Sequence, residues 1–186
     1  PSLLKLEYAC EKCRDTGYIE GTPCTCMRRR LMDRLYDQSN VRDVIKLENF
    51  DTFDLRLFDT EVVPAEGISP KENAQRNLKK AMEFAEHPEG ENLLLYGGAG
   101  RGKTFLCNCI AKEVLEHGKT VLYLTAGQLF KQLEDMRFRN KEEEEPFDWD
   151  SEILDADLLI IDDLGTEFAT MFTASELFRI VNDRKL

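Results

Sequence analysis

A chain of 186 residues that is 42% hydrophobic and 33% charged can bury the core of one domain and has room for a small appendage. Its formal net charge of −11 excludes a generic polyanion binder, so any contact with nucleic acid requires a local basic patch. No apolar stretch approaches the about 20 residues of a membrane span and no signal-peptide pattern is present, so we expect a cytoplasmic protein without membrane contact.

The first predicted element is a metal-binding segment built on four cysteines. They form a Cys-x-x-Cys pair and a Cys-x-Cys pair. Thiols this close in a cytoplasmic chain favour a tetrahedral zinc site of structural type over disulfides, because four thiolates leave no open position for water. The Cys-x-Cys spacing is less usual, so free or partly oxidised thiols remain the alternative. The zinc ligands that we predict are Cys10, Cys13, Cys24 and Cys26.

An arginine-rich helix is predicted directly after the cysteines, over residues 27–36. Met27, Leu31 and Leu35 form its apolar stripe at helical spacing, and arginines surround the stripe. These arginines are either a solvated basic face or a contact for a partner protein or a phosphate backbone, and both interpretations stay open. Because residues 47–186 carry all of the negative excess, we expect the segment 1–46 and the remainder to have different roles.

The stretch 41–60 is predicted to be a linker that contains Phe50, Phe53 and Phe58. We expect these rings to pack on the following domain, with a contact to adenine as the alternative. A helix is then predicted to begin at Ser69 and Pro70, because serine is a preferred N-cap and proline a preferred first helical residue.

A phosphate-binding loop follows, because residues 97–104 fit the pattern G-x-x-x-x-G-K-[ST]. The apolar run Leu93–Tyr96 before it is predicted to be a buried strand, and residues 105–117 after it a helix. In this order the loop amides and the helix N-terminus converge on phosphates. The nucleotide-binding residues that we predict are Gly97, Gly98, Ala99, Gly100, Arg101, Gly102, Lys103, Thr104 and Phe105.

Two side chains of this loop have specific chemical roles. Lys103 can place its charge on the β- and γ-phosphates of ATP, and the Thr104 hydroxyl can enter the shell of Mg²⁺. Cys107 and Cys109, in the helix that follows, are predicted to be small core residues and not metal ligands. The loop therefore predicts ATP and Mg²⁺ as cofactors, with Lys103 as a catalytic residue.

Beyond the loop, residues 120–124 are predicted to be a second strand and residues 126–139 a helix. The end of that helix, residues 137–141, places cations around an aromatic ring. This pattern is typical of a contact with single-stranded nucleic acid, but also of an ordinary helix end with cations that suit its dipole. The acidic run 142–145 is predicted to be a solvated loop.

The last predicted strand, residues 158–161, leads into Asp162 and Asp163. In a P-loop protein this is the Walker B strand, whose first acid holds Mg²⁺ and whose second orients the attacking water. We therefore predict Asp162 as a magnesium ligand beside Thr104, and both acids as catalytic residues. A final helix is predicted over residues 174–185.

Several of these stretches together resemble the bacterial replicative helicase loaders of the DnaC/DnaI type, within the AAA+ ATPases. The resemblance implies an α/β fold with a P-loop AAA+ core around a parallel sheet, residues 47–186, preceded by a small zinc-binding segment, residues 1–46. The resemblance rests on five stretches, of which the last two are the most specific: Cys10–Ile19, Glu48–Phe53, Asn92–Gly97, Gly102–Ala111 and Asp157–Glu167.

The resemblance implies an ATP-dependent accessory factor of DNA replication initiation. Its zinc-bearing segment would bind the replicative DNA helicase, and its AAA+ domain would bind ATP, Mg²⁺ and single-stranded DNA and deliver the helicase. Proteins of this type often assemble into homo-oligomers with nucleotide. The resemblance assigns Lys103, Thr104, Asp162 and Asp163 to the nucleotide site and the four cysteines to the zinc site.

Two departures from the family pattern matter. Many AAA+ proteins have Asp-Glu where this chain has Asp162-Asp163, and we expect the shorter second acid to give slow, switch-like hydrolysis. The strand with the polar sensor, the arginine finger and the helical lid of an AAA+ domain have no counterpart in the sequence. We therefore expect a truncated chain.

Three alternatives to a helicase loader remain open. An IstB-like transposition helper ATPase shares the most specific stretches but usually lacks the cysteine-rich start. A zinc-stapled P-loop kinase would transfer phosphate to a small molecule, although no acceptor-binding insertion is visible. A nucleotide-switched adaptor would bind a partner and hydrolyse ATP hardly at all.

Overall fold

Contacts divide the chain into two units, Pro1–Arg42 and Asp43–Leu186, and each is described by itself. The structure is a computed structural model that describes residues 8–27, 30, 41–88, 90–138, 148–166 and 170–184. Most of the predicted arginine-rich helix, residues 139–141 and the acidic run 142–145 lie outside the described residues. Among the described helices, none is long and apolar enough to cross a membrane.

The first unit contains a small antiparallel hairpin between β1 (Tyr18–Ile19) and β2 (Thr22–Pro23). The two residues of its turn, Glu20 and Gly21, both have positive φ angles, of 51° and 84°. A turn with this backbone twist matches the twist of the flanking strands and is therefore favoured in two-residue hairpins. The hairpin lies between the two cysteine pairs.

The stretch predicted to be a linker carries local structure, most of it in the second unit. Helix α2 (Val41–Leu47) is followed by two short 3-10 helices, η2 (Phe50–Thr52) and η3 (Leu55–Leu57). Asn49 caps η2 by accepting from the Asp51 N–H, and Asp54 caps η3 by accepting from the Arg56 N–H. These side-chain caps explain why a segment with little helical periodicity is nevertheless ordered.

Helix α3 (Pro70–Glu86) begins as predicted. Ser69 accepts a hydrogen bond from the Glu72 N–H while Glu72 accepts from the Ser69 N–H, so the two form a capping box. Pro70 occupies the first turn, where its missing N–H costs no helical hydrogen bond. The inner face of α3 consists of Ala74, Ala81 and Ala85, all buried.

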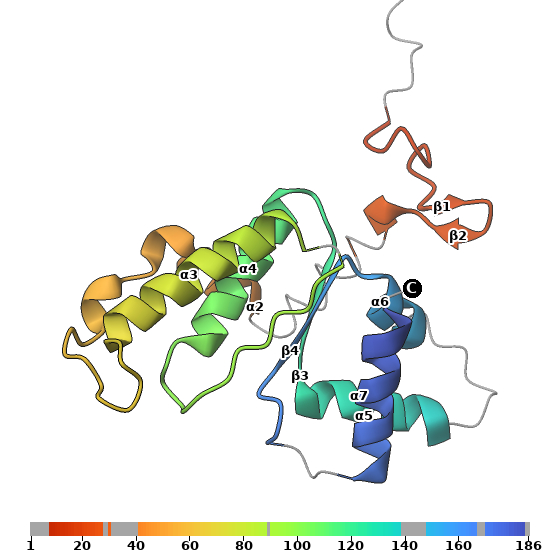
Figure 1. Ribbon diagram of the computed structural model, residues 1–186. Helices are drawn as coiled ribbons and strands as arrows, with labels where there is room; N and C mark the ends of the chain where they lie inside the picture. Colours follow the sequence, from red (N-terminus) through yellow and green to blue (C-terminus); the bar gives the residue numbers. More distant parts are fainter. Residues whose placement is uncertain are drawn as a thin grey trace, which may run out of the picture. The chain divides into compact units, whose positions relative to one another are not determined.

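Two parallel strands, β3 (Val121–Thr125) and β4 (Leu158–Asp162), stand at the centre of the second unit. Figure 1 shows α3 and α4 (Lys103–Glu116) on one side of this strand pair, and α5 (Ala126–Phe138), α6 (Trp149–Asp155) and α7 (Met171–Asp183) on the other. Val121, Leu122 and Leu124 of β3 are buried, as nearly continuous apolar runs are in a covered parallel sheet. The helices α4, α5 and α7 agree with the sequence predictions to within three residues at each end, whereas α6 was not predicted.

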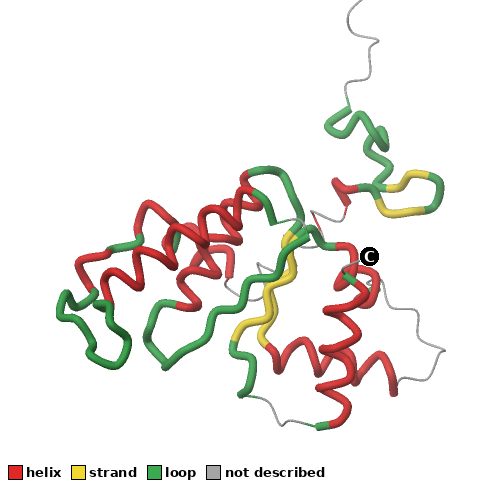
Figure 2. Tube along the Cα trace, viewed as in Figure 1, coloured by secondary structure: helices red, strands yellow, loops and turns green. Residues whose placement is uncertain are grey.

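The prediction of a buried strand at Leu93–Tyr96 is wrong. Residues 91–96 have no regular secondary structure, and Figure 2 draws them as loop between α3 and α4. Leu94 and Tyr96 are 72% and 89% exposed. A strand requires a neighbour that accepts and donates its backbone hydrogen bonds, and within the described part of the chain β3 and β4 pair only with each other.

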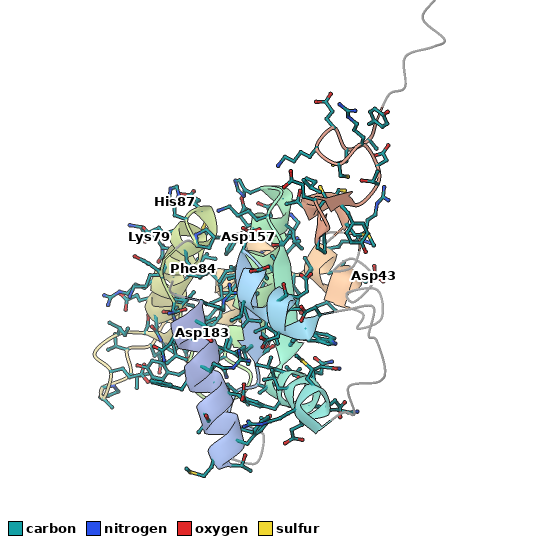
Figure 3. The ribbon with its side chains drawn as sticks, turned by 90° about the vertical axis from the view of Figure 1, so that its right-hand side faces the viewer. Asp43, Lys79, Phe84, His87, Asp157 and Asp183 are labelled. Carbon is teal, nitrogen blue, oxygen red and sulfur yellow. The ribbon has the colours of Figure 1, made fainter. Side chains whose placement is uncertain are left out.

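The start of the strand pair is clamped by Asp157 and Thr120. The Asp157 carboxylate accepts hydrogen bonds from the Thr120 N–H, at 2.6 Å, and the Thr120 hydroxyl, at 2.7 Å. The Asp157 N–H in turn contacts the Thr120 hydroxyl oxygen at 3.0 Å. Figure 3 labels Asp157 at this end of the pair. Because the clamp lies where the pairing begins, it sets which residues of β3 and β4 stand opposite each other.

We expect Asp157→Ala to lower the free energy of unfolding by about 1 kcal/mol, because two side-chain hydrogen bonds to the carboxylate are lost at a solvent-exposed position. Urea unfolding followed by circular dichroism measures this change. Asp135→Ala removes the same group from the exposed face of α5 and serves as the matched control. Equal urea midpoints for Asp157→Ala and Asp135→Ala would contradict a stabilising role for the contact between Asp157 and Thr120.

Candidate functional site

The phosphate-binding loop turns directly into helix α4. Gly102 is the N-cap of α4 and has a left-handed backbone with φ of 83°, and no side chain caps the first turn. Gly100 also has a positive φ, of 71°, which a residue with a Cβ adopts only at a cost. The uncapped N–H groups and the positive end of the helix dipole therefore face the loop, as an anion site requires.

Lys103 curls back over the same loop. Its ammonium donates hydrogen bonds to the carbonyl oxygens of Gly97, at 3.0 Å, and Gly98, at 2.9 Å. The structure thus brings the predicted Lys103 to the predicted glycines. Thr104 follows in the first turn of α4 and is exposed. A lysine charge and a threonine hydroxyl in the first turn of a helix can bind the phosphates of a nucleotide and their metal ion.

Both predicted acids lie at the end of β4. Asp162 is the last residue of the strand and half-buried, and Asp163 is exposed with a left-handed backbone, φ 55°. The Asp162 carboxylate accepts hydrogen bonds on both oxygens, from the Tyr123 hydroxyl at 2.8 Å and from the Asp163 N–H at 2.9 Å. Aspartate tolerates the left-handed region better than most residues with a side chain, which fits a short acid at position 163.

Helix α4 packs on both strands, and the end of β4 faces it. Burial and then the negative charge of Asp162 raise the pKa of the Cys107 thiol to about 12. Burial, with Cys107 and Asp162 as neighbours, also raises the pKa of Tyr123. Because Cys107 stands one helical turn after Thr104, Thr104 lies on the side of α4 that faces the acids. Cys109 is fully buried, as predicted.

The oxygen ligands on these facing elements suit a magnesium ion. Carboxylate and hydroxyl oxygens are the ligands that Mg²⁺ takes beside phosphates, and Asp162 and Thr104 offer them without a competing thiolate or imidazole ligand among the predicted site residues. The lone pairs of Asp162 that its two hydrogen bonds leave free can still accept a metal ion or its water. The donor set therefore fits the cofactor that the sequence predicts.

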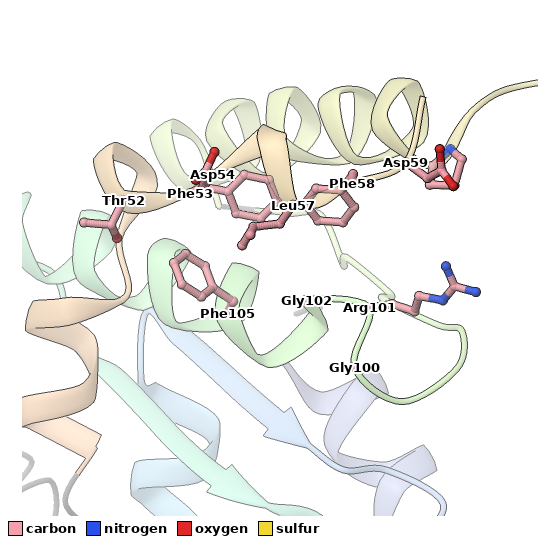
Figure 4. Close-up of a pocket in the computed structure, with 11 residues that line it drawn as sticks. Thr52, Phe53, Asp54, Leu57, Phe58, Asp59, Gly100, Arg101, Gly102 and Phe105 are labelled. Carbon is pink, nitrogen blue, oxygen red and sulfur yellow. The ribbon is translucent and has the colours of Figure 1, made fainter. Parts of the chain in front are cut away.

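An aromatic cavity of about 400 Å³ adjoins the loop. Figure 4 shows Phe53, Phe58 and Phe105 around it, next to Gly102 and Arg101. The rings of Phe53 and Phe58 stack with centroids 5.7 Å apart, and Phe105 meets Phe53 edge-on at 5.6 Å. Phe53 thus packs on Phe105 of the following domain, as the sequence predicted, and the rings also border the nucleotide loop.

Sequence reasoning gave little weight to Phe53 and Phe58 as binding residues. The whole of α3 separates them from the loop along the chain, so only the fold brings the two together. The segment that carries them is anchored to α4 by Asn108, which is buried and donates a hydrogen bond of 2.6 Å to Glu48. The one signal available in the sequence was the density of aromatic residues between positions 50 and 58.

The four cysteines of the first unit converge on one point. Their ligand atoms all lie within 4.8 Å of one another. The sulfur atoms of Cys13 and Cys26 are 3.3 Å apart, and those of Cys10 and Cys24 are 3.8 Å apart. These separations exceed the about 2.05 Å of a disulfide and are close to the about 3.8 Å between two sulfurs of a tetrahedral zinc site. The arrangement fits a zinc ion.

Hydrogen bonds link the cysteines to one another and fix the loop that carries them. Burial raises the pKa of Cys13, but contacts with Cys26 and the Gly17 backbone outweigh it and lower that pKa to about 7, and the same contact with Cys13 raises the pKa of Cys26 to about 12. Asp15 accepts hydrogen bonds from the N–H groups of Ala9, at 3.0 Å, and Cys10, at 2.8 Å, and so fixes the loop of the first cysteine pair. Partners of this kind orient metal ligands.

Comparison with known proteins agrees with this geometry. The chain is 25% identical over 161 residues to the replicative helicase loader DnaC of Escherichia coli strain K12, a match that covers 84% of this chain and 58% of DnaC. It is 33% identical over 91 residues to the chromosomal replication initiator protein DnaA of Campylobacter fetus subsp. fetus, which covers 49% of this chain and 20% of that protein. The chain thus spans less than two thirds of the length of these relatives.

A family model also matches most of the chain. The model of the family described as IstB-like ATP binding protein matches residues 30–185, a range that contains the phosphate-binding loop, the aromatic cavity and both acids. The resemblance to the DnaC type that the sequence motifs indicated is confirmed by the match to DnaC. The chain therefore belongs to the IstB-like ATP-binding proteins and resembles the replicative helicase loaders of the DnaC type.

Proposed function

We propose that this chain is the ATP-binding part of a helicase loader that acts in the initiation of DNA replication. The observation that carries the proposal is the packing of α4, which begins with the P-loop lysine, on β4, which leads into the two acids, within a chain similar to DnaC over 84% of its length. The similarity to DnaA, a replication initiator by name, supports the same process. The substrate would be ATP, and the biological outcome would be delivery of the helicase.

In the proposed site each group has a separate task. The α4 N-terminus and Lys103 bind the phosphates, Thr104 and Asp162 hold Mg²⁺, and Asp163 orients the attacking water. Bound Mg²⁺ supplies positive charge to the phosphates. Phe53 and Phe58 offer apolar ring surface to the adenine base. A shorter acid at position 163 is expected to hold water less well than glutamate, so hydrolysis is slow and acts as a switch.

The cysteine cluster is proposed to hold a structural zinc ion and to form the helicase-binding part. Its unit contains few buried apolar residues among those described, Cys13 and Cys24 being the buried ones, so a metal ion would supply the stability that a core cannot. Single-stranded DNA, and further copies of the chain assembled with nucleotide, are the other partners that we propose.

One observation favours a second function. The family that matches takes its name from IstB, and a transposition helper ATPase would use the same nucleotide site. The cysteine cluster favours the loader, because such helpers usually lack a cysteine-rich start. The two functions differ in their partner, so a test of partner binding separates them.

The replicative helicase of the same organism should be captured by the immobilised full-length protein in an ATP-dependent manner. Lys103→Ala is expected to weaken ATP binding by about 10- to 100-fold, because a charge-assisted hydrogen bond to phosphate is lost, and to remove the effect of ATP on capture. Lys112→Ala, on the same helix and paired with Glu116, is the matched control. No capture by a protein that binds ATP would favour the transposition helper.

Asp163→Asn should reduce ATP turnover by at least about 100-fold while leaving ATP binding within about twofold, because asparagine keeps the shape but cannot act as a base. Asparagine also tolerates the left-handed backbone at this position, so the fold is preserved. Phosphate release and equilibrium binding measure the two quantities. Unchanged turnover would exclude Asp163 from the reaction.

Purified protein is expected to contain one zinc ion per chain, measured by atomic emission. Cys13→Ser should lose this zinc, because Cys13 is a buried member of the cluster. Cys109→Ser changes a buried cysteine outside the cluster and should retain it. Chelation should unfold the first unit and leave ATP binding intact. Zinc that persists in Cys13→Ser would show that the cluster is not the metal site.

A further inference from the structure

Tyr123 is the residue of β3 that reaches the acid at the end of β4. In the parallel register Tyr123 stands opposite Ile160, two residues before Asp162. Residues two apart on a strand share a face and are separated by about 6.6 Å, which a tyrosine side chain that leans along the strand can span. The Tyr123 hydroxyl accordingly donates a hydrogen bond of 2.8 Å to Oδ2 of Asp162.

This hydrogen bond acts on a carboxylate that is held from both sides. Oδ1 of Asp162 accepts from the Asp163 N–H at 2.9 Å, so each oxygen has one protein donor and the plane of the carboxylate is fixed. A carboxylate offers about four acceptor positions, and two therefore remain. Of the two donors, the N–H belongs to the backbone, whereas the hydroxyl depends on the identity of residue 123.

The face that carries this contact is the one turned toward the phosphate-binding helix. Helix α4 packs on both β3 and β4, and its Cys107 is a neighbour of both Tyr123 and Asp162. Tyr123 is half-buried, which keeps its ring in place against the sheet.

We propose that Tyr123 is a positioning residue, which holds the Asp162 carboxylate in the orientation that binds the Mg²⁺ of the nucleotide. The inference rests on the proposed function and concerns one step of it, the affinity of the nucleotide site for the metal ion. Groups that hydrogen-bond to a metal ligand typically change metal affinity or activity by about 10- to 100-fold when removed. The side chain itself touches neither nucleotide nor metal.

The test is Tyr123→Phe, which deletes only the hydroxyl. Binding of a fluorescent non-hydrolysable ATP analogue is measured in EDTA and during a Mg²⁺ titration, with unfolding by urea followed alongside. In EDTA the variant is expected to match the wild type within about twofold. The Mg²⁺ concentration that gives half of the metal-dependent gain in affinity is expected to rise about tenfold. Tyr18→Phe, in the first unit, is the matched control.

A double-mutant cycle separates positioning from a structural role. In an Asp162→Asn background, Tyr123→Phe should not change the Mg²⁺ titration further, because the carboxylate on which it acts is absent. An unchanged or tighter Mg²⁺ dependence in Tyr123→Phe would overturn the proposal, and so would an equal loss of affinity with and without Mg²⁺. If the wild type itself showed no Mg²⁺-dependent nucleotide binding, that result would refute the proposed function and, with it, the role proposed for Tyr123.

Discussion

The parallel register of β3 and β4 is the constraint on which the nucleotide site depends. The clamp between Thr120 and Asp157 lies at the start of the pairing. Five residue pairs follow it, and the last of them is Thr125 opposite Asp162. A slip of one residue would turn the Asp162 side chain to the other face of the sheet, away from α4. The acid faces α4 because hydrogen bonds at the far end of the strands set the alignment.

The two units use different physical means to hold their functional groups. The nucleotide site is positioned by a packed layer of α4 on two strands, in which Cys109, Val114 and Val121 are fully buried. The cysteine unit has a hairpin with a two-residue turn and hydrogen bonds from backbone N–H groups to Asp15, which bring four thiols together but bury little apolar surface. Such a unit would gain its stability from the zinc ion that we propose, whereas the other gains it from its core.

The sequence was informative wherever a local pattern determines a local structure. The loop glycines, the capping box at Ser69 and the apolar run before Asp162 each specify their own conformation, and the four cysteines specify a cluster. It was misleading for Leu93–Tyr96, because an apolar run becomes a strand only beside another strand. It could not show that Phe53 and Phe58 border the loop or that Tyr123 reaches Asp162, because both contacts arise from packing between distant segments.

The central claim is that the P-loop, the two acids and the aromatic cavity form one site for Mg²⁺ and ATP. A crystal structure with Mg²⁺ and a non-hydrolysable ATP analogue tests it most directly. The account predicts that Lys103 leaves the carbonyls of Gly97 and Gly98 for the phosphates, that the metal ion lies beside Thr104 and Asp162, and that the base contacts Phe53 or Phe58. A nucleotide bound away from α4, or a metal ion remote from Asp162, would contradict it.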